Sequence, residues 1–316
     1  MRILFSTGNT LNHFDFDSGV LATIAEGPQE LFGISGDSTC LVLSHSGIDC
    51  ESLKTHADYV ASPQGVLSVT RQDGSRQTTE PWLLQPHQIE CHAGSVLCAN
   101  SGRNCLTVFD SALRPRDIFP TTAHWDIGPG ERKNSHFNSV HVQDNLVYVV
   151  AHNYARYSTV WVFEWPGFAL VDVIPTRSEW AHNILVLPDD MVVCNSKACT
   201  LYSVEAKEDI WRFGQEKYMT RALAANEECL IVGLSGMTSR GNRLNSHGGF
   251  CVLDRKTLRT LETYLFHEIG NVHEIRLLDE VDVCHGEDIL RLPPVFDLAK
   301  GAEFAERYPR VPINAA

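Results

Sequence analysis

One unit of about 40 to 60 residues is written six times along the chain, and this repeat limits the fold more than any other feature. The unit opens with a polar residue ahead of an apolar run, as in "HNILVLPDDMVVCNS" from His182 and "HQIECHAGSVLCANS" from His87. In both stretches an Asn-Ser pair stands 13 and 14 residues after the histidine, and further short β-rich runs follow. Such self-similarity predicts a ring or stack of small sheets.

We expect the six units to be the blades of a β-propeller. Their expected starts are Gln29, His87, Asn138, His182, Arg221 and His273. Four short strands per unit, separated by Gly, Asn, Asp and Pro turns, are typical of propeller blades. The prediction is an all-β, single-domain β-propeller over residues 1–316 with six blades, and five or seven blades stay open because the first unit is irregular.

The N-terminal segment fits this architecture as a closing element. Strand-like runs within about residues 1–26 have no innermost partner of their own. We therefore expect them to complete the last blade and close the ring, which removes exposed sheet edges.

Charge and cysteine usage narrow the class of partner. Asp and Glu outnumber Lys and Arg by 39 to 26, a formal net charge of −13 that disfavours nucleic acid and anionic membranes as partners. No signal-peptide core and no run of about 18 apolar residues is visible. Ten cysteines without a CxxC pair predict reduced, mostly buried thiols, and a cytoplasmic location is expected.

The polar openings of the units are the main functional signal. Innermost strands line the central channel of a propeller, so their starts should surround one mouth of that channel. The second strands return to the same face and are expected to end at His45, Asn100, His152, Asn195, Ser235 and His285. One face should therefore carry a ring of polar side chains.

Three histidines of this ring stand in repeat register. His87, His182 and His273 open units two, four and six, and alternate blades of a six-bladed ring lie about 120° apart. Three converging neutral imidazoles suit a catalytic divalent metal such as Fe, Mn, Zn, Ni or Cu. Glu274 and Asn183 are expected to support these ligands from behind. In the alternative interpretation each imidazole satisfies backbone groups of the loops without any metal.

Further candidates surround these histidines. Arg221 replaces histidine in unit five, and its guanidinium suits a bound anion, with a structural arginine as the alternative. The other substrate-binding candidates are Asn138 and Asn195, and the proton-transfer candidates are His141, His152 and His285. The segments 124–138, with His124, Asp126 and His136, and 235–249 lie on the same face, the second as a substrate lid or a plain surface loop.

From unit four onward the chain resembles a group of uncharacterised bacterial propeller proteins known only as domains of unknown function. The resemblance rests on "VVCNSKACTLY" (192–202), "TRALA" (220–224), "IVGLS" (231–235) and "GGFCVLDRKTL" (248–258). It covers roughly the C-terminal half and implies a propeller fold without implying an activity. The histidine-lined mouth is also similar, without a shared motif, to metal-dependent propeller lyases and four-histidine iron oxygenases.

Two hypotheses about function follow. The first is a metal-dependent enzyme, of the lyase, hydrolase or oxygenase class, that acts on a small polar or anionic substrate at the mouth. The second is a non-catalytic platform that binds a protein or glycan on the same face. Stoichiometric bound metal would separate them.

Overall fold

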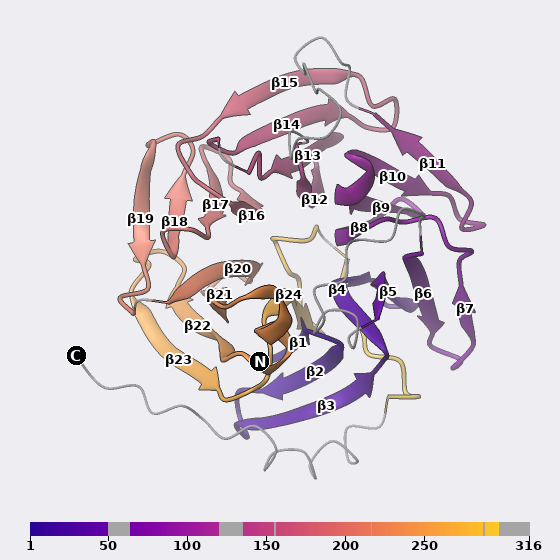
Figure 1. The fold of residues 1–316 in the computed structure, drawn as a ribbon, viewed down its shortest axis with the longest axis horizontal. Helices are drawn as coiled ribbons and strands as arrows, with labels where there is room; N and C mark the ends of the chain where they lie inside the picture. The colour runs from indigo at the N-terminus through magenta and orange to yellow at the C-terminus, as the bar shows by residue number, and fades with distance from the viewer. Residues whose placement is uncertain (50–63, 120–134, 155, 216, 287, 297–316) are drawn as a thin grey trace.

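The computed structural model shows six four-stranded antiparallel sheets arranged in a ring (Figure 1). The structure describes residues 1–49, 64–119, 135–154, 156–215, 217–286 and 288–296. The predicted all-β, six-bladed β-propeller is thereby confirmed. We number the blades 1 to 6 in the order of the six sequence units.

Each of the first five blades is made from consecutive strands, the innermost first. Blades 1 and 2 comprise β4 (Gln29–Gly36), β5 (Cys40–Asp49), β6 (Val66–Arg71) and β7 (Arg76–Thr78), then β8 (Pro86–His92), β9 (Ser95–Asn100), β10 (Cys105–Phe109) and β11 (Pro115–Ile118). Blades 3 and 4 comprise β12 (Phe137–Gln143), β13 (Leu146–Ala151), β14 (Thr159–Glu164) and β15 (Leu170–Pro175), then β16 (Ala181–Val186), β17 (Met191–Asn195), β18 (Thr200–Ser203) and β19 (Glu208–Arg212). Blade 5 comprises β20 (Tyr218–Ala225), β21 (Cys229–Gly236), β22 (Gly248–Asp254) and β23 (Thr260–Phe266).

Blade 6 joins the two ends of the sequence. Its innermost strand is β24 (Val272–Leu278), and its outer strands are β1 (Arg2–Thr7), β2 (Thr10–Asp15) and β3 (Val20–Glu26). β24 pairs antiparallel with β1 along its length. This sheet order agrees with the closure expected from the N-terminal segment.

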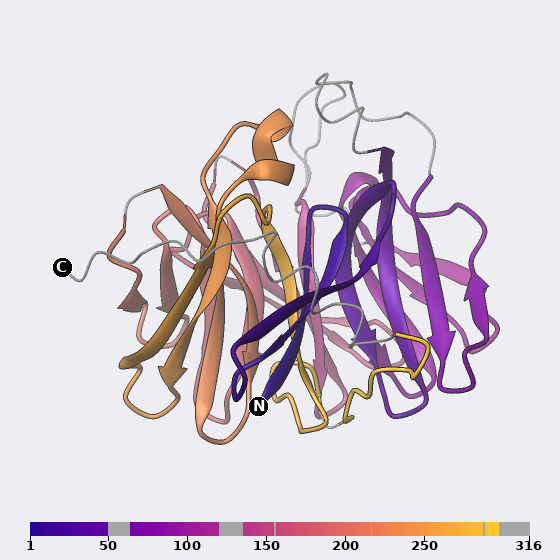
Figure 2. The same cartoon turned by 90° about the horizontal axis from the view of Figure 1, so that it is seen from below.

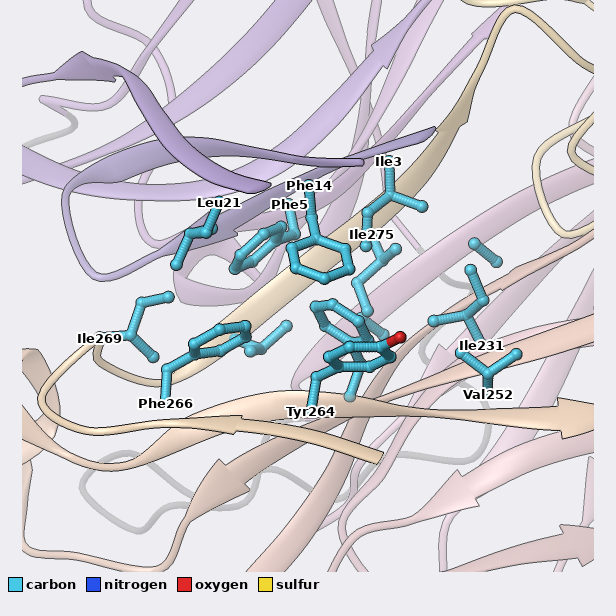
Figure 3. Close-up of a cluster of buried hydrophobic side chains, with 14 of the residues drawn as sticks. Ile3, Phe5, Phe14, Leu21, Ile231, Val252, Tyr264, Phe266, Ile269 and Ile275 are labelled. Carbon is cyan, nitrogen blue, oxygen red and sulfur yellow. The ribbon is translucent and has the colours of Figure 1, made fainter. Parts of the chain in front are cut away.

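Apolar clusters between neighbouring blades hold the ring together. Between blades 5 and 6, the ring of Phe14 lies 4.8 Å from that of Tyr264 and 5.2 Å from that of Phe250, both edge-on (Figure 3). Such aromatic pairs contribute about 0.5–1.5 kcal/mol each beyond the area they bury. Because adjacent sheets share these clusters, the inner strands are fixed relative to one another.

The cysteines of the described residues are free thiols, as the sequence predicts. Cys98, Cys194 and Cys251 are fully buried within their strands. Burial raises the pKa of each of these thiols, and that of Cys251 is raised to about 11. They therefore pack as small hydrophobic side chains.

Every innermost strand has a register irregularity close to its start. In β8 the shift falls between Pro86 and Ile89, in β16 between His182 and Ile184, and the other four strands are interrupted at the corresponding point. Bulges of this kind redirect a side chain out of the regular alternation of the sheet. They turn the first residues of the innermost strands towards the channel mouth.

The two faces of the ring carry different additions (Figure 2). The short helix η3 (Arg240–Asn245) projects from the face where the innermost strands begin. The described residues that follow β24, 279–286 and 288–296, run along the opposite face. Among the described residues, no helix combines the length and apolarity needed to cross a membrane.

Candidate functional site

A cavity of about 510 Å³ lies at the mouth where the innermost strands begin. This volume falls within the range of about 300–1,000 Å³ that is typical of small-molecule sites. The residues that line it include His87, His136, His152, His182, Arg221 and Arg243. Four of the predicted site residues, His87, His152, His182 and Arg221, are thus brought together here.

His273 lies beside this group and is absent from the cavity lining. Its ring packs on that of Phe32, with 4.3 Å between the ring centroids, and Phe32 also packs on His87 at 4.7 Å. Both ring nitrogens of His273 are buried without a hydrogen-bond partner among the described residues. An aromatic side chain therefore lies between two of the three histidines that were predicted to share a metal.

Phe32 also corrects the predicted start of unit one. Before the register shift, Leu31 pairs with His45 in blade 1 just as Pro86 pairs with Asn100 in blade 2. This alignment makes Phe32, and not Gln29, the counterpart of His87. The spacing of 14 residues from Phe32 to Ser46 repeats that from His87 to Ser101, and this signal could have identified it.

The predicted metal ligands are not assembled as a group. In the part of the chain that the structure describes, no three His, Cys, Asp or Glu side chains are placed to hold one ion. His87 and His182 share the cavity, whereas His273 is absent from its lining and packs on Phe32, which also contacts His87. As a set, His87, His182 and His273 do not fit a three-histidine metal site.

His87 and His182 are held by the same pair of contacts. In each ring, Nδ1 faces the carbonyl oxygen two residues earlier in the chain, at 3.0 Å for His87 and 2.7 Å for His182. Nδ1 also lies 2.9 Å from Oγ of Ser101 and 2.8 Å from Oγ of Ser196, respectively. Because a carbonyl oxygen can only accept, Nδ1 carries the proton in both neutral rings, and Nε2 is a bare acceptor.

Serines at or just after the ends of the second strands tie blades 2, 4 and 5 to the blade that follows each of them. Their hydroxyl groups donate to the carbonyl oxygen just before the mouth position of the following blade, and in blade 3 an asparagine amide does the same. The donor–acceptor pairs are Ser101–Phe137, Asn138–Ala181, Ser196–Thr220 and Ser235–Val272. The Ser of the repeated Asn-Ser pair, and the amide of Asn138, therefore serve blade-to-blade contacts, and Asn138 does not line the cavity.

Ser196→Ala is expected to lower the free energy of unfolding by about 1–3 kcal/mol, because the buried carbonyl of Thr220 loses its hydroxyl donor. Urea denaturation followed by tryptophan fluorescence measures this change. Ser18→Ala, on an exposed turn, is the control and should stay within about 0.5 kcal/mol of the parent protein. Equal effects of the two substitutions would contradict the proposed role of Ser196.

His152 presents the opposite tautomer to the cavity. Its Nδ1 accepts a hydrogen bond from the backbone N–H of Tyr154 at 3.0 Å, so the proton of the neutral ring is on Nε2. The Tyr154 hydroxyl in turn lies 2.8 Å from Nδ1 of His136. The cavity thus contains bare imidazole nitrogens from His87 and His182 and an N–H donor from His152.

The imidazoles that line the cavity are neutral at physiological pH. Burial, reinforced by the nearby charge of Arg221, lowers the pKa of His87 and of His152 to about 3. The same two causes lower the pKa of His182 well below its usual value. These rings act as uncharged hydrogen-bonding groups.

Arg221 is a buried cation in this neutral surrounding. Arg221 is 5% exposed, and its Nε has no hydrogen-bond partner among the described residues. Burial, followed by the repulsion of Arg243, lowers the pKa of Arg221 to about 9, while Glu30 and Glu274 act in the opposite direction. The guanidinium therefore remains charged at neutral pH.

The segment 235–249, which was predicted to be a substrate lid or a plain surface loop, forms one wall of the cavity. It contributes Met237, Thr238 and Arg243 to the lining. Its end is tied to the turn before β24, where the N–H of Asn271 donates to the carbonyl of Arg243 at 3.1 Å and Oγ of Ser246 contacts Oδ1 of Asn271 at 2.6 Å. These contacts anchor this wall to the turn that precedes β24.

Of segment 124–138, His124 and Asp126 lie outside the described residues, whereas His136 lines the cavity.

His141 and His285 lie deeper in the channel, away from the mouth cavity. His285 was expected at the end of a second strand, but the second strand of blade 6 is β1, and His285 follows β24 near the opposite face. Its Nε2 donates to the carbonyl of Leu223 at 2.9 Å and lies 3.4 Å from Glu274. Neither histidine is therefore among the residues that line the mouth cavity.

The remaining predicted residues are bonded within the scaffold. Nδ2 of Asn183 donates to Glu274 at 3.1 Å, and its Oδ1 accepts from the N–H of Ala222 at 2.9 Å. Glu274 thus supports Asn183 and His285 below the mouth. Asn195 accepts from the N–H of Glu179 at 2.9 Å and donates to Asp209 at 3.1 Å, outside the cavity lining.

Sequence reasoning missed several residues of the lining, among them Glu30, Tyr154 and Trp180. One signal was available in the repeat. Gln85 and Trp180 each stand two residues before a mouth histidine, and both have left-handed backbone, with φ of 51° and 57°. Both line the cavity, so the position two residues before the histidine belongs to the site.

No protein-family model and no curated protein matches the sequence. Solved structures match the fold. A chain from a crystal structure of a nidogen/laminin complex aligns with a TM-score of 0.62 at 9% identity, over 87% of this chain and 97% of that chain. A protein of unknown function from Bacteroides caccae aligns with a TM-score of 0.60 at 12% identity, over 88% of this chain and 99% of that chain. At these identities the likeness shows the fold alone.

Proposed function

We propose that the mouth cavity binds a small anionic molecule through Arg221. The observation that carries this proposal is a charged guanidinium, 5% exposed, whose Nε has no partner among the described residues and which lines a cavity of about 510 Å³. Holding such a cation away from water costs free energy, and a ligand carboxylate or similar anion would offset that cost with charge-assisted hydrogen bonds.

The other charges of the lining support the same sign of ligand. Arg243 lies in the cavity wall beside Arg221, close enough to lower its pKa. Glu30 is the acidic residue among the lining residues that the structure describes, so two cations face one carboxylate. The cavity is thus locally positive on a chain whose net charge is −13. Such focusing of charge favours anions over cations.

Arg221→Gln is expected to weaken binding of small anions at least about tenfold, because a neutral amide keeps some hydrogen bonds but loses the charge. Calorimetric titration of acetate, succinate, phosphate and sulfate in a low-chloride buffer measures the effect. Arg212→Gln is the matched control, because Arg212 is 62% exposed on β19 and should leave binding unchanged. Equal affinities of the parent protein and Arg221→Gln for every anion that binds would overturn the proposal.

A metal-dependent enzyme of the lyase, hydrolase or oxygenase class is the second candidate. It is favoured by His87 and His182, whose Nδ1 is anchored and whose bare Nε2 is the form of imidazole that binds Fe, Mn, Zn, Ni or Cu. Because His273 does not complete that set, no reaction step is assigned to a metal. A protein or glycan platform, which needs no small ligand, becomes the better account if no anion binds.

Elemental analysis of untagged protein separates the first two candidates. Because the described residues supply two fitting imidazoles and no third ligand, we expect less than about 0.1 transition-metal ion per chain. One ion per chain, lost in His182→Ala with the fold intact, would instead establish the metal site.

A cytoplasmic location and membership of the uncharacterised bacterial propeller group remain proposals. The free, buried thiols support a reducing compartment. The group membership rests on the sequence motifs of the C-terminal half, since no family model matches.

A further inference from the structure

We infer that the anion bound at the mouth also carries hydroxyl groups, so that the ligand class is a hydroxycarboxylate. This inference rests on the proposed function, and it adds which other groups of the ligand the cavity recognises besides the anionic group. It follows from the hydrogen-bond acceptors that the cavity presents beside its cations.

The first step is the pair of bare imidazole nitrogens. Nδ1 of His87 and of His182 faces a backbone carbonyl and a serine hydroxyl, which leaves Nε2 as the acceptor in each ring. Both rings line the cavity. Their hydrogen-bond contacts with the described residues are all made by Nδ1. A ligand that fills the cavity must therefore supply donors to these two atoms.

A simple carboxylate does not supply them. Its oxygens are acceptors only, so it satisfies Arg221 but places its lone pairs against any Nε2 that it approaches. The same holds for sulfate and for fully ionised phosphate. The cavity is therefore only partly matched by an anion without O–H or N–H groups.

An ammonium group would supply donors, but its charge fits the cavity poorly. It would lie in the same small space as the guanidinium groups of Arg221 and Arg243, with Glu30 as the single acidic residue among the described lining. A hydroxyl donates without adding positive charge. Hydroxyl groups are therefore the favoured donors, and an amino group at Glu30 is the competing outcome.

The neighbouring donor strengthens this choice. The ring of His152, whose Nε2 carries a proton, has its centroid 5.8 Å from that of His182, whose Nε2 is bare. One hydroxyl can donate to an acceptor and accept from a donor at the same time, which neither a carboxylate nor an ammonium can do. Phe32 and Trp180 provide apolar walls for the carbon chain between the polar groups.

A series of four-carbon acids tests the inference by calorimetry. Succinate, malate and tartrate share the carbon skeleton and the charge and differ only in zero, one or two hydroxyls, while aspartate carries an ammonium instead. We expect affinity to rise in the order succinate, malate, tartrate, by at least about tenfold overall, with aspartate no tighter than succinate. Equal affinities across the first three, or tightest binding of aspartate, would overturn the inference and leave the proposed function standing. No binding by any of the four overturns both.

A variant locates the effect. His182→Phe keeps an aromatic ring but removes the acceptor, so the ratio of tartrate affinity to succinate affinity should fall to near that of malate to succinate or below. His92→Phe, at the far end of β8, is the control and should keep the ratio of the parent protein. An undiminished ratio in His182→Phe contradicts the inference.

Nitrogen-15 spectra of the imidazoles give a readout that does not depend on a variant. We expect Nδ1 protonated and Nε2 bare in His87 and His182, and the reverse in His152. Protonated Nε2 in both His87 and His182 would remove the acceptors and overturn the inference.

Discussion

Replacing Arg276 by methionine is expected to lower the free energy of unfolding by about 3–5 kcal/mol. The residue is 1% exposed, and its Nη1 donates to the carbonyl of Ile34 and to Oγ of Ser35, each at 3.1 Å. The guanidinium also lies 3.9 Å from carboxylate oxygens of Glu90 and of Asp282. Methionine fills the space but leaves both carboxylates buried without this cation. Urea denaturation at pH 7.5 measures the loss.

Arg2→Met is the matched control. Arg2, in β1, forms an ion pair with Asp279, which directly follows β24, the strand that contains Arg276. The side chains of Arg2 and Asp279 are 44% and 41% exposed. Exposed pairs contribute about 0–1 kcal/mol, so this variant should stay close to the parent protein. Similar losses of unfolding free energy in the two variants would show that Arg276 does not stabilise the fold through its contacts with the buried Glu90 and Asp282.

Mild acid is expected to unfold the protein. Burial is the main cause that lowers the pKa of seven described imidazoles along the channel, which are those of His87, His136, His141, His152, His182, His273 and His285. In the unfolded chain these rings bind protons near pH 6.5, whereas in the folded protein they stay neutral to lower pH. Their contribution to stability is therefore present above about pH 6.5 and is lost as pH falls.

Three buried carboxyl groups act in the opposite direction. Burial raises the pKa of Glu90 and Glu274 well above the usual value and that of Asp282 to about 6. Their contribution is present below the unfolded pKa of about 4 and is lost as pH rises. Seven imidazoles outweigh three carboxyls between about pH 6.5 and 4.5, so the net effect is loss of stability in acid.

Seven imidazoles less three carboxyls leave at most about four net protons taken up on unfolding, so the free energy of unfolding should fall by up to about 5 kcal/mol per pH unit in this window. At that slope, a domain with a free energy of unfolding of about 5–10 kcal/mol would unfold between about pH 5.5 and 4.5. Urea denaturation at pH 7.5, 6.5 and 5.5 measures the slope. A free energy that is unchanged from pH 7.5 to 5.5 would contradict the burial of neutral imidazoles.

The blades were predictable because each repeats the same short-range signals. The polar opening and the apolar run that follows it reflect an innermost strand with a bulge near its start. The Ser that stands 14 residues after His87 and after His182 reflects a hydrogen bond to the next blade. In blade 1 the opening residue is the apolar Phe32, and the nearby polar residue Gln29 was predicted in its place because the other openings known from the sequence are polar. The repeat fixes the position, while the side chain at that position is free to change.

The site was only partly predictable, because it depends on how blades face one another. Blade order places His87 and His273 on either side of blade 1, but only the structure shows that Phe32 contacts both rings. The same holds for His285. It was predicted to end the second strand of blade 6, but the N-terminal segment supplies that strand as β1. The protonated nitrogen of each imidazole also depends on contacts across loops, which spacing does not reveal.

A crystal structure of the protein with tartrate tests directly whether the mouth binds a hydroxycarboxylate. We predict tartrate in the mouth cavity, with a carboxylate within hydrogen-bond distance of the Arg221 guanidinium and a hydroxyl on Nε2 of His182. Tartrate bound only on the outer surface, or a cavity in which Arg221 turns away from the bound acid, would contradict it.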